Sequence, residues 1–153
     1  MSPGPEAWHE AGHALAAHLL NGVVRELTLE SELDGLEGHV AVEWPTAATE
    51  ECAARRQALV ALAGPVAELV FRGEDVLEDP HALSAWRGDW EEAQTQLSQL
   101  HAEDEAREAG LRAMLAELHE LFAVADGYER LARLADALDA HGTLDRDLFL
   151  EAI

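Results

Sequence analysis

Two histidines and a glutamate stand close together near the start of the chain, in the segment His9-Glu10-Ala11-Gly12-His13. Side chains four residues apart on an α-helix project from the same face, so the two imidazoles can bind one Zn²⁺ ion. Glu10 lies beside them, where its carboxylate can accept a proton from a water on that ion. The pattern is typical of a zinc site that activates water. The alternative is a polar helix face that carries two unrelated histidines.

A catalytic zinc site also needs a third protein ligand and an open fourth position. The metzincin pattern has a glycine three residues after the second histidine and a histidine six residues after it. Ala16 and Leu19 occupy these positions here. His18 lies about 140° around the helix from His13 and therefore points elsewhere. The third ligand must come from farther along the chain.

The segment 9–15 resembles the metal motif of the FtsH family, the membrane-bound AAA+ zinc proteases. The resemblance extends over nearly the whole chain, through segments 24–29, 38–42, 59–73, 88–93 and 142–145 in the family's order. It implies a zincin-like, mostly helical peptidase domain. It also implies that His9, His13 and Asp89 bind Zn²⁺ and that Glu10 is the general base.

Asp89 also has a purely structural interpretation. It follows a glycine, begins a predicted helix and has Glu92 three residues later, as an acidic N-cap with a capping-box partner does. Glu68 and Glu74 are the alternative third ligands. Glu68 stands in an apolar run, where a structural hydrogen bond is the more common role.

Other side chains with possible roles at the site lie on neighbouring segments. His39 and His81 could approach the site, and Trp86 and Trp90 flank Asp89. We interpret the two tryptophans mainly as packing anchors that could also line a cleft.

The hydrophobic pattern predicts the elements that must position these residues. We expect one domain over residues 1–153, mainly α with a small β-hairpin or sheet. The predicted elements, in chain order, are a helix over 6–20, strands over 23–30 and 39–44, a helix from Thr46 or Thr49 to Arg72 with a kink or break at Gly64-Pro65, an irregular loop over 74–87, helices over 89–109, 111–125 and 128–140, and a short terminal helix capped by Thr143.

Composition limits the partners that we expect. The net charge is −21, and all ten basic residues are arginine. Such an acidic surface repels phosphates, which argues against nucleic acid and anionic lipid as partners. A single cysteine, Cys52, precludes an internal disulfide, and no apolar stretch reaches the length of about 20 residues that spans a bilayer. We therefore expect a cytoplasmic protein without membrane insertion.

These observations favour a zinc metalloendopeptidase that acts on a peptide or protein substrate. Because the sequence contains no ATPase module, a separate ATPase or a homo-oligomer is a possible partner. The alternative is a non-catalytic binding or regulatory protein that keeps the fold and acts through a partner. Glu10 discriminates between the two, since only hydrolysis needs a general base. A third hypothesis, an acidic mimic of nucleic acid, rests on the charge alone.

Overall fold

The structure, a computed structural model, describes residues 3–29 and 38–153. This part of the chain is mainly helical with a small antiparallel sheet, which confirms the predicted fold class. Among the described residues, no helix is long and apolar enough to cross a membrane. The elements, in chain order, are α1 (Pro5–Leu19), β1 (Val23–Thr28), β2 (His39–Glu43), α2 (Glu50–Arg72), the 3₁₀ helix η1 (Pro80–Ala85), α3 (Arg87–Leu100), α4 (Asp104–Ala123), α5 (Ala125–His141), β3 (Thr143–Asp145) and α6 (Arg146–Ala152).

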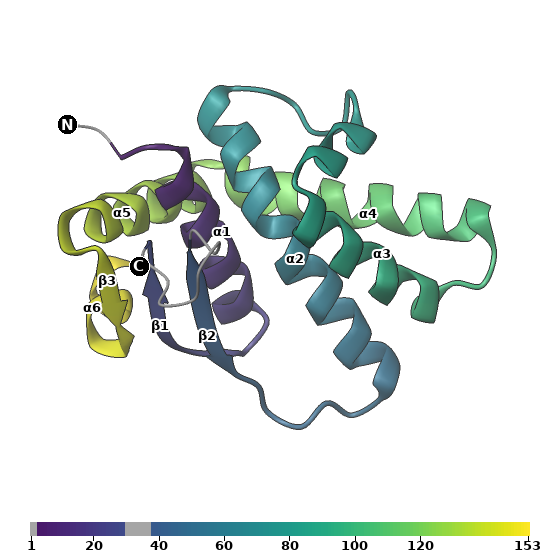
Figure 1. Cartoon of the computed structure of the whole chain (residues 1–153), viewed down its shortest axis with the longest axis horizontal. Coiled ribbons are helices and arrows are strands. Elements are labelled where there is room, and N and C mark those ends of the chain that lie inside the picture. The colour runs from purple at the N-terminus through teal and green to yellow at the C-terminus, as the bar shows by residue number, and fades with distance from the viewer. Residues whose placement is uncertain (1–2, 30–37) are drawn as a thin grey trace.

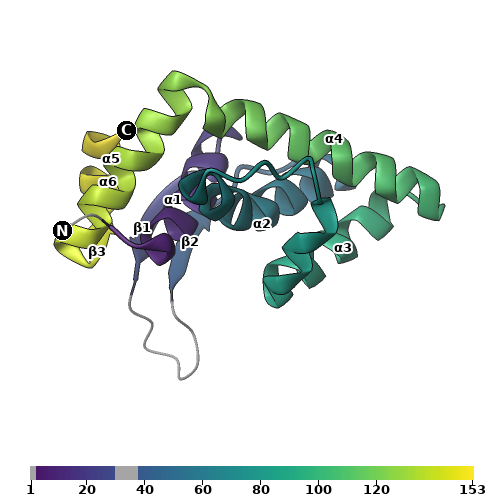
Figure 2. The same ribbon diagram turned by 90° about the horizontal axis from the view of Figure 1, so that it is seen from above.

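Helices α1 and α2 pack side by side at the centre of the molecule (Figure 1). Helix α5 packs on α1 and α4 packs on α2, and Figure 2 shows α4 and α5 along one side of this central pair. The sheet contacts α1, and α3 contacts α2. Buried residues of α1, α2, α4 and α5 form one hydrophobic core between these layers.

The close contact between α1 and α2 depends on Gly12. A Cβ built at Gly12 would lie 2.5 Å from the carbonyl oxygen of Ala63 and 2.5 Å from Cβ of Ala67. Real side chains do not approach that closely, so only glycine lets the two helix backbones come together here. Gly12 is buried together with Trp8 and Leu15, which lie on the same face of α1, whereas Leu19 is exposed.

The break expected at Gly64-Pro65 does not occur, because α2 runs unbroken through Pro65. A proline inside a helix removes one hydrogen bond and costs about 3 kcal/mol. Residues 61–69 of α2 are all buried. This burial between α1 and the neighbouring helices offsets the cost of the proline. The helix ends at Arg72, as predicted, and Gly73 follows it in a left-handed conformation.

The predicted hairpin is present, with β1 and β2 antiparallel and Thr28 opposite His39. The strands end earlier than predicted, at Thr28 and Glu43, and residues 30–37 of the expected connection lie outside the described part. The sequence analysis missed a third strand, β3, which pairs with β1 to give the order β2-β1-β3. Three residues are too few to show an alternating pattern, so only the pairing with β1 defines this strand.

The helix predicted over 89–109 is wrong in both bounds. Helix α3 begins at Arg87 and ends at Leu100, and α4 begins after His101, whose backbone is extended. The chain turns back there, and the ring of His101 lies over Gly110, where a Cβ would come within 2.8 Å of its Nε2. Gly110 therefore lies inside α4, where it leaves room for the His101 ring, and does not end a helix.

Two helix caps decide between expected alternatives. The Thr49 hydroxyl accepts a hydrogen bond from the Cys52 N–H at 3.0 Å, so Thr49 rather than Thr46 caps α2. The terminal helix α6 is capped by Asp145, which accepts from the Leu148 N–H at 2.9 Å, and not by Thr143. Thr143 lies in β3, and its hydroxyl is 2.7 Å from that of Thr28.

We predict that Gly12→Ala destabilises the protein by about 1–3 kcal/mol, because the added methyl group overpacks the contact between α1 and α2. Gly88→Ala in α3 is the matched control, since a Cβ there meets nothing within 4 Å. It should be neutral or slightly stabilising because alanine is the better helix former. Urea unfolding of both variants measures the difference, and equal stabilities would contradict the packing role of Gly12.

Candidate metal centre

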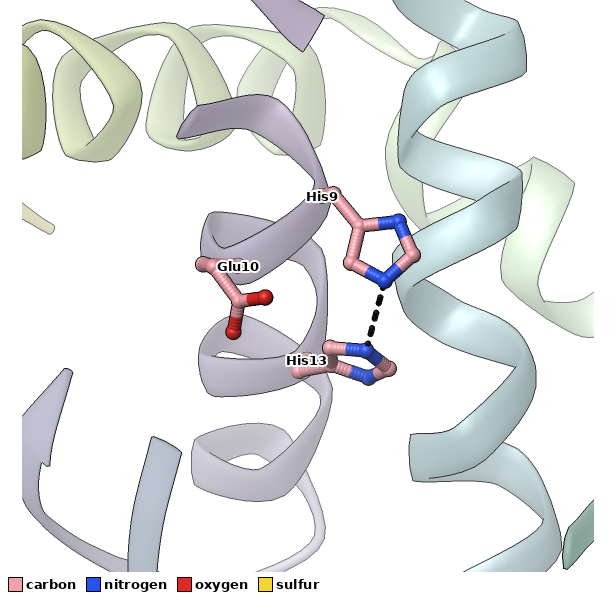
Figure 3. Close-up of side chains that lie close together, drawn as sticks. All are labelled: His9, Glu10 and His13. Carbon is pink, nitrogen blue, oxygen red and sulfur yellow. Dashed lines mark hydrogen bonds between the residues drawn. The ribbon is translucent and has the colours of Figure 1, made fainter. Parts of the chain in front are cut away.

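His9 and His13 leave α1 on the side that faces α2, and their rings meet there (Figure 3). The Nε2 atoms of the two rings are 3.0 Å apart. The rings are inclined to each other by 79°. The helical spacing of four residues therefore brings both imidazoles to one point, as the sequence predicts.

The outer nitrogen of each ring is held by α2. His13 Nδ1 donates to the carbonyl oxygen of Val60 at 2.6 Å, and His9 Nδ1 lies 2.8 Å from Oε2 of Glu68. A carbonyl or carboxylate oxygen can only accept, so each Nδ1 carries the hydrogen in this network. Each neutral ring then presents a lone pair at Nε2. Glu68 thus holds His9 at Nδ1, on the opposite side of the ring from Nε2. Its carboxylate does not lie where the two Nε2 atoms meet.

Asp89 brings a third ligand atom to the same place. Its Oδ2 lies 2.9 Å from His9 Nε2 and 3.4 Å from His13 Nε2. Atoms bound tetrahedrally to one zinc ion at 2.0–2.1 Å are about 3.3 Å apart. The three atoms therefore fit one zinc ion. The capping interpretation of Asp89 is wrong, since Trp86 is the N-cap residue of α3 and no side-chain cap bond forms there.

The cluster needs a positive charge. Two lone pairs and a carboxylate oxygen converge within 3.4 Å. Burial would lower the pKa of His9, but hydrogen bonds to Asp89 and Glu68 and the charges of Asp89 and Glu10 raise it to about 9. Burial would raise the pKa of Asp89, but its hydrogen bonds to His13 and His9 hold it well below the usual range. Without a metal ion, a proton on His9 supplies the charge.

Gly64 gives the two imidazoles their room. A Cβ at Gly64 would lie 2.7 Å from His9 Nε2 and closer still to the ring of His13. The glycine lies on the buried face of α2, where the backbone cannot retreat. This role is invisible in the sequence, where Gly64 reads only as a helix breaker.

Glu10 lies next to the two histidines without joining their contact (Figure 3). One of its oxygens and one ring nitrogen of each histidine lie within 4.8 Å of one another. Burial is the main cause that raises the pKa of Glu10, although the neighbouring histidines oppose it. A Cβ at Gly38 would lie 2.6 Å from Glu10 Oε1, so Gly38 leaves space for the carboxylate.

The cluster opens into a cleft of about 680 Å³. Strand β2 forms one wall, and parts of α1, α2 and the start of α3 form the rest. The residues that line it are Glu6, His9, Glu10, His13, Gly38, His39, Val40, Val42, Gln57, Val60, Ala61, Glu68, Trp86, Arg87, Gly88, Asp89 and Glu92.

Of the other candidates from the sequence, some line the cleft and others do not. His39 and Trp86 line the cleft, as considered possible. Trp90 instead packs against His81, with ring centroids 5.5 Å apart, and His81 bonds Glu108 at the surface. Glu74 is exposed after α2 and is not among the cleft residues, and Glu68 contacts His9 at Nδ1, so Asp89 is the candidate whose carboxylate lies at both Nε2 atoms.

Comparisons of the sequence with protein-family models and with curated proteins give no match.

The raised pKa of His9 predicts an unusual pH dependence of metal binding. Because the ion must displace the His9 proton at any pH below about 9, zinc affinity should rise about tenfold per pH unit between pH 7 and pH 8. A histidine of ordinary pKa would already be deprotonated, and affinity would level off. Competition titration against a chromophoric chelator across this range measures the slope, and a plateau above pH 7 would contradict the prediction.

The same pKa carries a stability contribution in the metal-free protein. Since the folded state raises the pKa of His9 to about 9, the contribution is complete below the unfolded value near 6.5 and is lost as pH rises through 9.

Proposed function

We propose that this protein is a zinc-dependent metallopeptidase, with Zn²⁺ held by His9, His13 and Asp89 and with Glu10 as general base. One observation carries the proposal: three potential ligand atoms converge within 3.4 Å, and the partly buried carboxylate of Glu10 stands beside them in an open cleft. Three protein ligands leave one coordination position free, as catalytic zinc sites require. Glu10 belongs to neither the ligand contacts nor the supporting bonds, which leaves its carboxylate available for proton transfer.

A zinc ion bound here would polarise a substrate carbonyl and lower the pKa of a bound water. Glu10 would take the proton from the attacking water and deliver it to the amine that leaves when the peptide C–N bond breaks. Burial raises the pKa of Glu10, which makes its carboxylate a stronger base than that of an exposed glutamate and favours uptake of the proton. Glu68 and the Val60 carbonyl hold the two imidazoles in the tautomer whose Nε2 can bind metal.

The substrate would be an extended peptide, bound along β2. This strand is at the edge of the described sheet, with β1 on its other side, and it lines the cleft from Gly38 to Val42. An added peptide strand can pair with the free N–H and C=O groups of such an edge. This would lay the scissile bond beside the metal ligands.

This function agrees with the resemblance to the peptidase domain of the FtsH family, including a zincin-like organisation of the metal helix. We extend the proposal to a partner chain, either a separate ATPase or a second copy, which would deliver substrate. The acidic composition makes nucleic acid an unsuitable partner.

Asp89→Asn tests the ligand set. A neutral amide is a much poorer zinc ligand than a carboxylate, so we expect zinc affinity to fall more than about a hundredfold. Glu92→Gln is the matched control, since it removes an acidic group from the same helix and the same cleft. It should bind zinc as the wild type does. Metal content after dialysis and chelator competition give both values, and unchanged affinity in Asp89→Asn would remove Asp89 from the ligand set.

Glu10→Gln tests the mechanism. The amide keeps the volume of the side chain but cannot take up the proton, so zinc content should stay at one ion per chain while kcat falls about 10²–10⁴-fold. Glu6→Gln, at the cleft end of α1, should retain full activity. Cleavage of a quenched fluorescent peptide library measures kcat. Equal activity in Glu10→Gln would refute the assignment, and a wild type that holds zinc but cleaves nothing would favour the non-catalytic binding role.

A further inference from the structure

Trp86 makes a contact that packing alone does not explain. Its indole N–H donates a hydrogen bond to Oε2 of Glu68, the same oxygen that receives His9 Nδ1. Trp86 lies between η1 and α3, 18 residues after Glu68 in the sequence, and the fold brings the two side chains together. One carboxylate oxygen therefore joins the histidine on α1 to the segment that precedes α3.

The second oxygen of Glu68 is also engaged. Arg72, one turn later on α2, places a guanidinium nitrogen 3.8 Å from Oε1. The same guanidinium lies over the ring of Trp86, 5.6 Å from its centroid. Glu68, Arg72 and Trp86 thus form a closed set of contacts, and the Glu68 carboxylate is buried within it.

The backbone of Trp86 is fixed as firmly as its ring. Its N–H donates to the Leu83 carbonyl at 3.0 Å, and its own carbonyl accepts from the Trp90 N–H at 2.8 Å. That second bond is the first of α3, so the position of Trp86 determines where α3 begins. Asp89 is the third residue of this helix. A shift at Trp86 would therefore move the Asp89 carboxylate relative to the two imidazoles.

We propose that Trp86 is a positioning residue of the metal centre. Its contact with the shared carboxylate of Glu68 sets the position of α3, and so of Asp89, relative to His9. The inference rests on the metal centre proposed above and adds to it a residue that touches no metal. His9 and His13 form a preset half of the site on α1, and their outer nitrogens are held by α2. Asp89 belongs to α3, and the indole of Trp86 sets the position of that helix. Removing the indole N–H should leave three ligands present but the third misplaced.

Trp86→Phe tests this by removing the N–H while keeping an aromatic ring. Removing a group that supports a ligand typically lowers metal affinity 10- to 100-fold, and we expect about tenfold here. The visible absorption bands of bound Co²⁺, which report the geometry of its ligands, should also change in position or intensity. A role in packing alone would alter thermal unfolding of the metal-free protein but not the spectrum of bound Co²⁺.

Trp90→Phe is the matched control. Trp90 flanks Asp89 on the other side, packs against His81 and contributes nothing to the cleft wall. It should keep the wild-type zinc affinity and Co²⁺ spectrum, and both variants should unfold at similar temperatures without metal. Wild-type affinity and spectrum in Trp86→Phe, or equal losses in the two variants, would overturn the positioning role while leaving the metal centre intact. A wild-type protein that binds neither Zn²⁺ nor Co²⁺ would overturn the metal centre and this inference together.

Discussion

The close approach of α1 to α2 builds the core and shapes the site beside it. Two glycines permit it from opposite sides: Gly12 on α1 meets the backbone of α2, and Gly64 on α2 meets the imidazoles of α1. At a larger separation, Val60 and Glu68 could not reach the outer ring nitrogens. The same contact that builds the core thus orients the histidines. A substitution in the core should therefore shift the two imidazoles.

Three carboxylates surround the two histidines, and their surroundings give each a different role. Asp89 faces both Nε2 atoms, which hold its pKa low and keep it charged. Glu68 receives hydrogen bonds from His9 and Trp86 and is occupied as a support. Glu10 occupies space that Gly38 leaves open, and burial raises the pKa of its carboxyl group. A divalent cation would balance this concentration of negative charge better than the single proton on His9 does.

The site is assembled from segments that are distant in sequence. Helix α1 supplies His9, His13 and Glu10, α2 supplies the oxygens that hold the two imidazoles, and α3 supplies the Asp89 carboxylate across an intervening loop. Trp86 lies where that loop meets α3 and contacts Glu68 on α2. This contact fixes the start of α3, as the proposed role of Asp89 requires, since a metal ligand must be held within about 0.5 Å of its productive position.

The sequence by itself determined the local features, because these depend on residues within a turn or two of each other. The spacing of His9 and His13 and the alternation in β1 and β2 follow from helical and strand periods. Only the tertiary structure decided what depends on distant partners. It carried α2 through Pro65, moved the boundary between α3 and α4 to His101, paired β3 with β1, and made Asp89 a neighbour of the histidines instead of a cap. Burial and pairing outweigh local propensity in each of these cases, and neither can be read from a short stretch of sequence.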